Sequence, residues 1–149
     1  MTLPIFMDFV HKADRAYAAA CRPVAEEFGL SKTSFDILMF LANNPRYCTA
    51  RDISSMRNIK ANVVSLHVDR LVRDGYLTRQ AVPEDRRKVR LACTEKAGAI
   101  IRRGRDAQKS YYQQLLQGLT AQDLDAFKHC FDVVLSNADN MLSASIREK

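Results

Sequence analysis

Apolar side chains recur at steps of three and four along the beginning of the chain. From Ile5 to Phe28 they fall on one face of a helix, so the spacing predicts a long amphipathic helix. Gly29 follows at the position that favours glycine after a helix, and Ser31 suits the start of the next one. Residues 37–42 are all apolar and leave no polar face, which predicts a second helix buried at the centre of the fold.

The next segment predicts a short polar helix and then a break. Thr49 and Asp52 have the spacing of an N-terminal helix cap. Ile53 and Met56 are the positions expected to face inward from this helix. Asn58 marks the break, because asparagine tolerates a left-handed backbone better than most residues.

A further helix and a hairpin are expected after this break. The helix covers about residues 60–74, and its inward side chains are Val64, Val68, Leu71 and Val72. Two short runs with strand character follow at residues 76–79 and 89–93, and residues 83–88 join them as the tip of a hairpin.

Two long helices complete the chain. Thr94 is expected to cap the first, over about residues 95–117, and Thr120 begins the second. The second carries an apolar stripe with an average period of 3.5 residues, formed by Leu124, Phe127, Phe131, Val134, Ala138 and Met141. Such a narrow stripe is typical of a helix that packs along another helix.

Charge is concentrated in the middle of the chain. Residues 51–105 hold 14 basic and 6 acidic side chains, a net charge of +8, whereas residues 1–50 are neutral and residues 106–149 carry −2. A local basic block points to a polyanionic partner, most often nucleic acid, and a solvated basic surface is the alternative. A hydrophobic content of 47%, with 5 Gly and 4 Pro, excludes intrinsic disorder.

Several other classes of protein are disfavoured. No apolar run approaches the roughly 18–20 residues of a membrane span. The four cysteines are widely spaced and the three histidines lack zinc-ligand spacing, so neither a metal site nor a disulfide scaffold is expected. Motifs of hydrolases, nucleotide-binding loops and metalloproteases do not occur, which predicts neither an enzyme nor a cofactor. The N-terminus does not resemble a secretion signal, so we expect a cytoplasmic protein.

A short helix, a turn, a second helix and a hairpin with a basic tip form a winged helix-turn-helix. The second helix has about the width of the B-DNA major groove, so its outward side chains can reach base edges. The wing suits a narrow minor groove, and the start of the first helix suits a phosphate. A corner of two helices that binds no nucleic acid is the alternative. The DNA contacts predicted here are Thr49, Arg51, Arg57, Lys60, Asn62, Ser65, His67, Arg70, Arg86, Arg87 and Lys88.

The central sequence resembles the MarR family of bacterial transcriptional regulators. VDRLVRDGYLTR at residues 68–79, PEDRR at 83–87 and CTEKA at 93–97 are similar to its pattern V-D-R-L-x-x-x-G-L-[IV]-x-R, P-x-D-x-R and L-T-x-x-G/A. FGLS at 28–31 is similar to its G-L-[ST]. The chain departs from the pattern at three positions, which are usually apolar, often glycine and often arginine in the family: Arg57, Asn58 and Leu66.

The resemblance implies a mainly α-helical homodimer with a β-wing of two to three strands, which binds a palindromic operator in double-stranded DNA, usually as a repressor. Residues 1–30 and 96–149 correspond to dimerisation helices, and residues 31–95 to the DNA-binding domain. In the family's wing an aspartate, here Asp85, braces an arginine that enters the minor groove, here Arg87. A dimeric winged-helix module that binds an acidic protein or RNA is the alternative function.

The resemblance also implies two ways of sensing a signal. Many relatives respond to small aromatic or phenolic ligands in a crevice beside the winged domain, and the corresponding candidates here are His11, Arg15, Tyr17 and Met39. Others oxidise a cysteine near the start of the first helix, for which Cys21 is the candidate. A sensing thiol needs a lowered pKa. The alternative for Cys21 is a small apolar side chain in the core.

Overall fold

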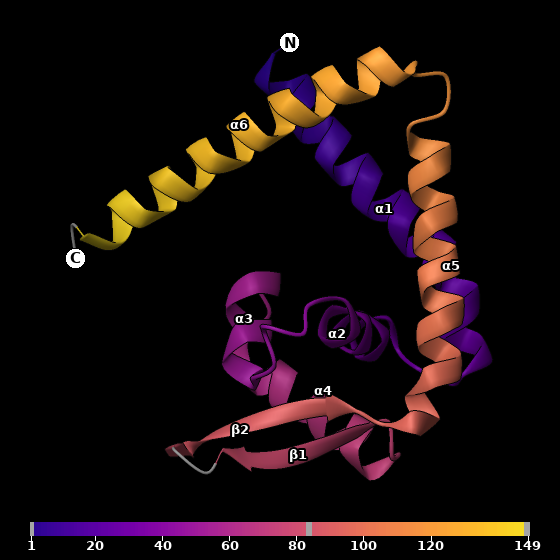
Figure 1. Cartoon of the computed structure of the whole chain (residues 1–149), viewed down its shortest axis with the longest axis vertical. Helices are drawn as coiled ribbons and strands as arrows, with labels where there is room; N and C mark the ends of the chain where they lie inside the picture. The colour runs from indigo at the N-terminus through magenta and orange to yellow at the C-terminus, as the bar shows by residue number, and fades with distance from the viewer. Residues whose placement is uncertain (1, 83–84, 148–149) are drawn as a thin grey trace. The chain divides into compact units, whose positions relative to one another are not determined.

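The computed structural model describes residues 2–82 and 85–147, with the side chains of residues 2–82 and 88–143. Its described residues form two units that divide between Tyr111 and Tyr112. The elements in chain order are α1 (Leu3–Glu27), α2 (Lys32–Asn43), α3 (Ala50–Arg57), α4 (Ala61–Arg73), β1 (Leu77–Val82), β2 (Asp85–Cys93), the short 3-10 helix η1 (Glu95–Ala97), α5 (Gly98–Leu115) and α6 (Ala121–Arg147). Figure 1 shows these elements along the chain.

Helix α2 lies at the centre of the first unit, as its apolar sequence predicts. Every residue from 34 to 41 is buried, and α1, α3, α4 and the hairpin pack around this helix. Figure 1 shows α2 end-on between them. Ser31 caps α2 by accepting a hydrogen bond of 3.2 Å from the Ser34 N–H, which confirms the predicted start of the helix.

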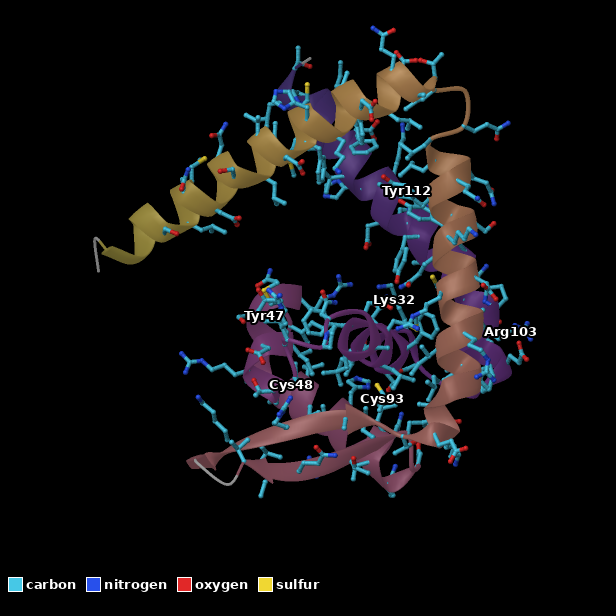
Figure 2. The ribbon with its side chains drawn as sticks, in the orientation of Figure 1. Lys32, Tyr47, Cys48, Cys93, Arg103 and Tyr112 are labelled. Atoms are coloured by element: carbon cyan, nitrogen blue, oxygen red, sulfur yellow. The ribbon has the colours of Figure 1, made fainter. Side chains whose placement is uncertain are left out.

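Helices α1 and α5 lie side by side in antiparallel directions within the first unit. The guanidinium of Arg103 on α5 forms an ion pair with the carboxylate of Glu27 at the end of α1, with an N–O distance of 2.8 Å. Figure 2 labels Arg103 beside α5. Further along, the Tyr111 hydroxyl donates to the Ala13 carbonyl at 3.0 Å. These contacts connect the first helix of the chain to the fifth over several turns.

The predicted helix-turn-helix is confirmed, with one error. Asn58 has a φ of 50°, in the left-handed region, and separates α3 from α4. Ile53 is buried as expected, but Met56 is 53% exposed and is not an inward residue. Ile53 is the residue through which the eight-residue helix α3 reaches the core.

The wing is a two-stranded antiparallel sheet whose strands are longer than predicted. Residues 85–88, expected in the hairpin tip, belong to β2, and the pairing register shifts between Ala81 and Val82. The Leu91 N–H donates to the Cys48 carbonyl at 2.7 Å. The segment before α3 therefore adds one hydrogen bond to the wing without forming a third strand among the described residues.

Thr94 does not cap a helix through its side chain, contrary to the prediction. It precedes η1 rather than a continuous α-helix, and its hydroxyl donates to the Gly75 carbonyl at 2.7 Å. Gly75 lies between the end of α4 and the start of β1 and has a φ of 78°. The Thr94 hydroxyl therefore holds the two ends of the wing together.

Helix α6 begins as predicted. Thr120 and Asp123 form a reciprocal cap, in which the Thr120 N–H donates to the Asp123 carboxylate at 2.9 Å and the Asp123 N–H donates to the Thr120 hydroxyl at 3.2 Å. The described side chains of this helix are exposed in the single chain. No helix within residues 2–82 and 85–147 has the length and apolar character needed to cross a membrane.

Candidate nucleic-acid interface

The start of α3 is held by a capping box rather than left open. The Thr49 N–H donates to the Asp52 carboxylate at 2.9 Å, and the Thr49 hydroxyl accepts from the Asp52 N–H at 3.1 Å. The backbone N–H and hydroxyl of Thr49 thus already have partners, and the Asp52 carboxylate adds negative charge where a phosphate was predicted. Arg51, the second residue of α3, is exposed.

One face of α4 is buried and the opposite face is open to solvent. Val64, Val68 and Leu71 belong to the core, which confirms the predicted stripe. The predicted DNA contacts Lys60, Asn62, Ser65 and Arg70 are all exposed on the remaining surface of this segment. The sequence therefore assigned these side chains to the correct side of the helix.

The acidic residue on this open face has a basic partner. Asp69 forms an ion pair with Arg79 of β1. This pair connects α4 to the wing and places a positive charge beside the Asp69 carboxylate, which lessens its repulsion of a polyanion. Arg79 was not among the predicted site residues, because the pairing of residues 69 and 79 depends on how the hairpin folds back beside α4.

His67 contacts the interior of the domain. Its Nδ1 atom lies 2.9 Å from the hydroxyl oxygen of the buried Ser34 at the start of α2. Burial, and then the charge of Arg70, lower the pKa of His67. The side chain thus connects α4 to α2, whereas the sequence placed it among the DNA contacts.

The wing carries further cations on its described part. Lys88 and Arg90 are exposed on β2, and residues at this spacing share one face of a strand. Arg90 was not predicted, although it adjoins the buried Leu91 and therefore falls on the opposite, outward face of the strand. The side chains of the predicted Asp85, Arg86 and Arg87 lie outside the described residues.

Arg57, the last residue of α3, lines a polar cavity that the prediction did not foresee. The cavity has a volume of about 100 Å³ and is bordered by α1, α2 and α5. Tyr17 lines it too, and its hydroxyl accepts a hydrogen bond of 2.7 Å from Gln108. Burial raises the pKa of Tyr17 to about 12. The unusual arginine at position 57 thus adds charge to this cavity.

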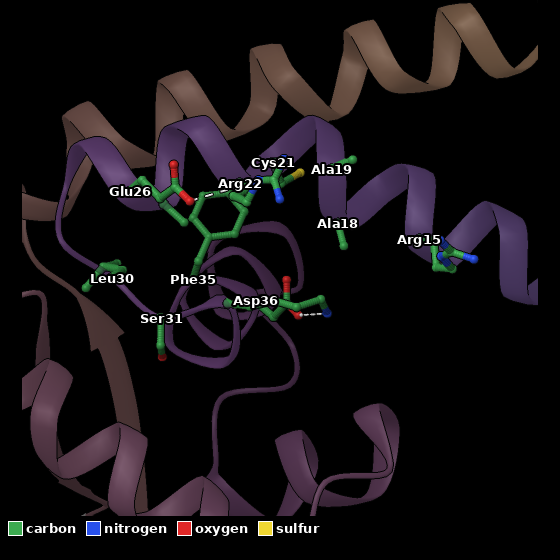
Figure 3. A pocket seen from close by; sticks show the side chains of 12 residues that line it. Arg15, Ala18, Ala19, Cys21, Arg22, Glu26, Leu30, Ser31, Phe35 and Asp36 are labelled. Atoms are coloured by element: carbon green, nitrogen blue, oxygen red, sulfur yellow. Dashed lines mark hydrogen bonds and ion pairs between the residues drawn. The ribbon is translucent and has the colours of Figure 1, made fainter.

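A larger cavity of about 570 Å³ lies between α1 and α2. Phe35 and Leu30 give it apolar walls, and Arg15 and Arg22 line it from α1 (Figure 3). Ser31 lines it as well, with its hydroxyl oxygen 3.1 Å from that of Ser34.

The four predicted ligand contacts do not share one cavity. Arg15 lines the larger cavity, and Tyr17 and Met39 line the smaller one. Met39 is buried in the core, and His11 is exposed on α1 and lines neither cavity. Their grouping from the sequence mixed residues that lie on different faces of α1 and α2.

Cys21 has properties opposite to those of a reactive thiol. It is 3% exposed, and burial raises its pKa. Since the thiolate is the reactive form, a raised pKa disfavours oxidation. The structure favours the alternative, in which Cys21 is a small apolar residue of the core.

A family model and several solved structures of MarR proteins are similar to this chain. Residues 28–88 match the sequence model of the MarR family. A MarR transcriptional regulator from Methanosarcina mazei Go1 has 18% identity and a TM-score of 0.78 over 93% of this chain and 99% of that chain. A search of curated proteins found no match.

Two similar structures contain DNA. A MarR family regulator from Listeria monocytogenes, complexed with a 26mer DNA, has 18% identity and a TM-score of 0.78 over 91% of each chain. A mutant MarR from E. coli, complexed with operator DNA, has 19% identity and a TM-score of 0.67 over 89% of this chain and 94% of that one. The family model thus matches the winged helix-turn-helix of this chain, and the chain shares the fold of these MarR proteins along most of its length.

Proposed function

We propose that this protein is a sequence-specific DNA-binding transcription regulator that acts as a homodimeric repressor. The observation that carries the proposal is the open face of α4, where Lys60, Asn62 and Ser65 are exposed opposite the buried stripe. Asparagine can form a bidentate pair with adenine, serine can bond a base or a phosphate, and lysine contacts guanine or phosphate. This face lies within the segment of net charge +8.

The wing and the relatives support duplex DNA as the partner. Lys88 and Arg90 extend the positive charge from α4 onto β2. Two proteins with this fold were solved with DNA. In this proposal residues 31–95 bind DNA and residues 1–30 and 96–149 hold two copies together. The proposal includes a cytoplasmic location, where such a regulator meets DNA, and a role in binding rather than in catalysis.

A titration with three fluorescent ligands tests the proposal. Random duplex DNA, single-stranded RNA and an acidic peptide are each titrated with the protein over a series of salt concentrations. We expect duplex DNA to bind most tightly. The logarithm of its binding constant should fall linearly with the logarithm of the salt concentration. Tighter binding of RNA or of the peptide would instead favour the alternative function.

Two lysine variants locate the contact. Lys60→Gln removes a charge from the proposed interface, whereas Lys109→Gln removes the same charge from the exposed surface of α5. If Lys60 contacts a phosphate, the Lys60→Gln substitution lowers the magnitude of the slope of log K against log salt concentration by about one unit. Lys109→Gln leaves the slope unchanged. Equal slopes for the two variants would mean that Lys60 makes no phosphate contact.

A small aromatic or phenolic effector is the second part of the proposal. The larger cavity is within the usual size range of ligand pockets, roughly 300–1,000 Å³. Its Phe35 wall suits an aromatic ring, and Arg15 and Arg22 suit an acidic or phenolic group. Ser31 connects this cavity to α4 through Ser34 and His67, so a ligand that moves Ser31 has a short route to the DNA-binding helix.

Benzoate and phenol test this part. Calorimetry measures their binding, and release of labelled operator measures their effect. We expect Arg15→Ala to weaken benzoate, with Lys12→Ala, one turn away on the exposed surface of α1, as the matched control. Ser34→Ala should bind benzoate normally but release less DNA. Binding without any release from the intact protein would contradict an effector role for this cavity.

A further inference from the structure

Leu66 is an exposed apolar side chain in the middle of the proposed DNA-binding face. It is 66% exposed, although Val64, Val68 and Leu71 of the same helix are buried in the core. It lies four residues after Asn62 and four before Arg70, so the three side chains form one row along the helix. An apolar residue is thus flanked along α4 by an amide and a guanidinium.

The surroundings of Leu66 favour a polyanion as the partner that covers it. Lys60 and Arg70 are exposed on the same helix segment, and Lys88 and Arg90 are exposed on the wing. Asp69, the nearest acidic residue along α4, is already paired with Arg79. A hydrophobic protein surface would offer no anionic group to Lys60, Arg70 and Arg90, whereas the phosphates of a duplex would pair with them.

The edge of the DNA major groove offers one apolar group, the C5-methyl of thymine. An aliphatic side chain on a helix in this groove gains by covering that methyl and gains nothing comparable from the polar edges of the other bases. Asn62, one turn earlier in the same row, is suited to the N6 and N7 atoms of adenine. The row therefore combines an adenine contact and a methyl contact at neighbouring base pairs.

We propose that Leu66 selects a thymine in each half-site of the operator by packing against its C5-methyl group. The inference rests on the proposed function and adds a base preference to it. It also gives a consequence to the departure at position 66, where the MarR family pattern often has arginine. Leucine at this position replaces a cationic contact with an apolar one.

The test removes the methyl group without changing any hydrogen bond. An operator is first selected from random duplex DNA with the intact protein. Each thymine pair related by the two-fold symmetry is then replaced by deoxyuridine. We expect one position at which the intact protein loses about fourfold in affinity per half-site, or about 15-fold for both, since a buried methyl group contributes of this order.

Variants of Leu66 connect that loss to the side chain. Leu66→Ala should bind the thymine and deoxyuridine operators equally, while Leu66→Met, which stays apolar, should retain most of the difference. Met56→Ala, at another exposed apolar residue, serves as the control and should keep the full profile. Circular dichroism checks that each variant folds, which we expect because Leu66 lies outside the core.

The outcomes separate this inference from the proposed function. If Leu66→Ala and the intact protein show the same sensitivity to deoxyuridine at every position, Leu66 does not contact a thymine methyl, and the DNA-binding function still stands. If no position is sensitive in the intact protein, the inference is overturned as well. If no duplex can be selected, both the inference and the proposed function fail.

Discussion

Individual side chains on α4 divide into two groups by their partners. His67 and Asp69 are held by Ser34 and Arg79, so they fix α4 against its own domain. Asn62 and Ser65 make no such contact among the described residues and remain available at the surface. The first group positions the helix, and the second can contact a partner.

Exchanging Asn62 and Arg87 for alanine should separate base recognition from general attraction. Asn62→Ala should weaken binding to the operator by about 1–3 kcal/mol and change binding to random DNA little, because it removes a base contact. Arg87→Ala should weaken both, because the wing contributes charge. Titration of each variant with operator and random duplexes measures this. Equal losses on both duplexes for Asn62→Ala would show that it does not contact a base.

The stability of the protein should depend on the charge state of His67. Its pKa is lowered in the folded chain by burial and by Arg70, so below about pH 6.5 the unfolded chain binds the proton more readily. The stability contributed by neutral His67 is therefore complete above that pH and is lost as the pH falls through the lower pKa of the folded state. Urea unfolding at pH 7.5 and at pH 5.5 measures this effect. Between the two pH values, the free energy of unfolding should fall more for the intact protein than for His67→Gln. Parallel losses would assign the effect to other groups.

At the scale of elements, α5 approaches the buried helix α2 closely at one residue. Gly104 lies in the middle of α5, and a Cβ atom there would come within 3 Å of the Met39 side chain and 3.2 Å from the Phe35 ring. Both side chains are buried in the core, so the end of the Met39 side chain and the Phe35 ring must move to admit a Cβ atom. Glycine is therefore needed at this crossing despite its weak helix propensity.

Gly104→Ala should lower the free energy of unfolding by about 1 kcal/mol, the difference between two opposing effects. Overpacking a tight core typically destabilises by 1–3 kcal/mol, which exceeds the gain in helix propensity of at most about 1 kcal/mol. Gly98→Ala, at the first residue of the same helix, is the control, because its nearest neighbour would be 3.5 Å away. Denaturant unfolding should show the control to be as stable as the original or slightly more so. If Gly104→Ala matched it, the crossing would have room to relax.

At the scale of the whole molecule, apolar residues are exposed on the terminal helices. Leu124, Phe127 and Phe131 of α6 are all exposed, and the two phenylalanine rings stack with centroids 5.9 Å apart. On α1, Phe6 and Val10 are exposed. Exposed apolar surfaces of this kind usually mark an interface, and a second copy of the chain is the partner we propose.

The apolar stripe predicted on α1 is thus exposed in its first part and packed against α5 in its later part. Phe6 and Val10, near its start, are exposed, whereas Tyr17 packs edge-on against Tyr111 of the same chain, with ring centroids 5.5 Å apart. Ala13, between them, accepts the hydrogen bond of Tyr111. The part of α1 available to a partner is therefore shorter than the sequence predicted.

Replacing both Phe127 and Phe131 with alanine should dissociate the dimer. Each substitution should weaken association by roughly 3–5 kcal/mol if the ring is buried between copies. Asp125→Ala combined with His129→Ala changes the opposite face of the same helix and should leave the dimer intact. Sedimentation at micromolar concentration distinguishes the two results. An original protein that sediments as a monomer would refute the dimer itself.

The sequence alone determined the features that depend on neighbours along the chain. The caps at Ser31, Thr49 and Thr120, the turn at Asn58 and the burial of α2 all follow from residue types at fixed short spacings. Helix hydrogen bonds and the side-chain period of 3.6 residues are local, so their pattern is present in the sequence. The open side of α4 followed from the same period.

Only the tertiary structure decided which residues from distant segments meet. The exposure of Met56, the partner of the Thr94 hydroxyl and the contact of His67 with Ser34 were not predicted. Each depends on how two elements approach in space, which the identity and spacing of residues within one element do not specify. Arg57 lines its cavity for the same reason: α1 and α5 come from opposite ends of the first unit and close around α2 only in the folded chain.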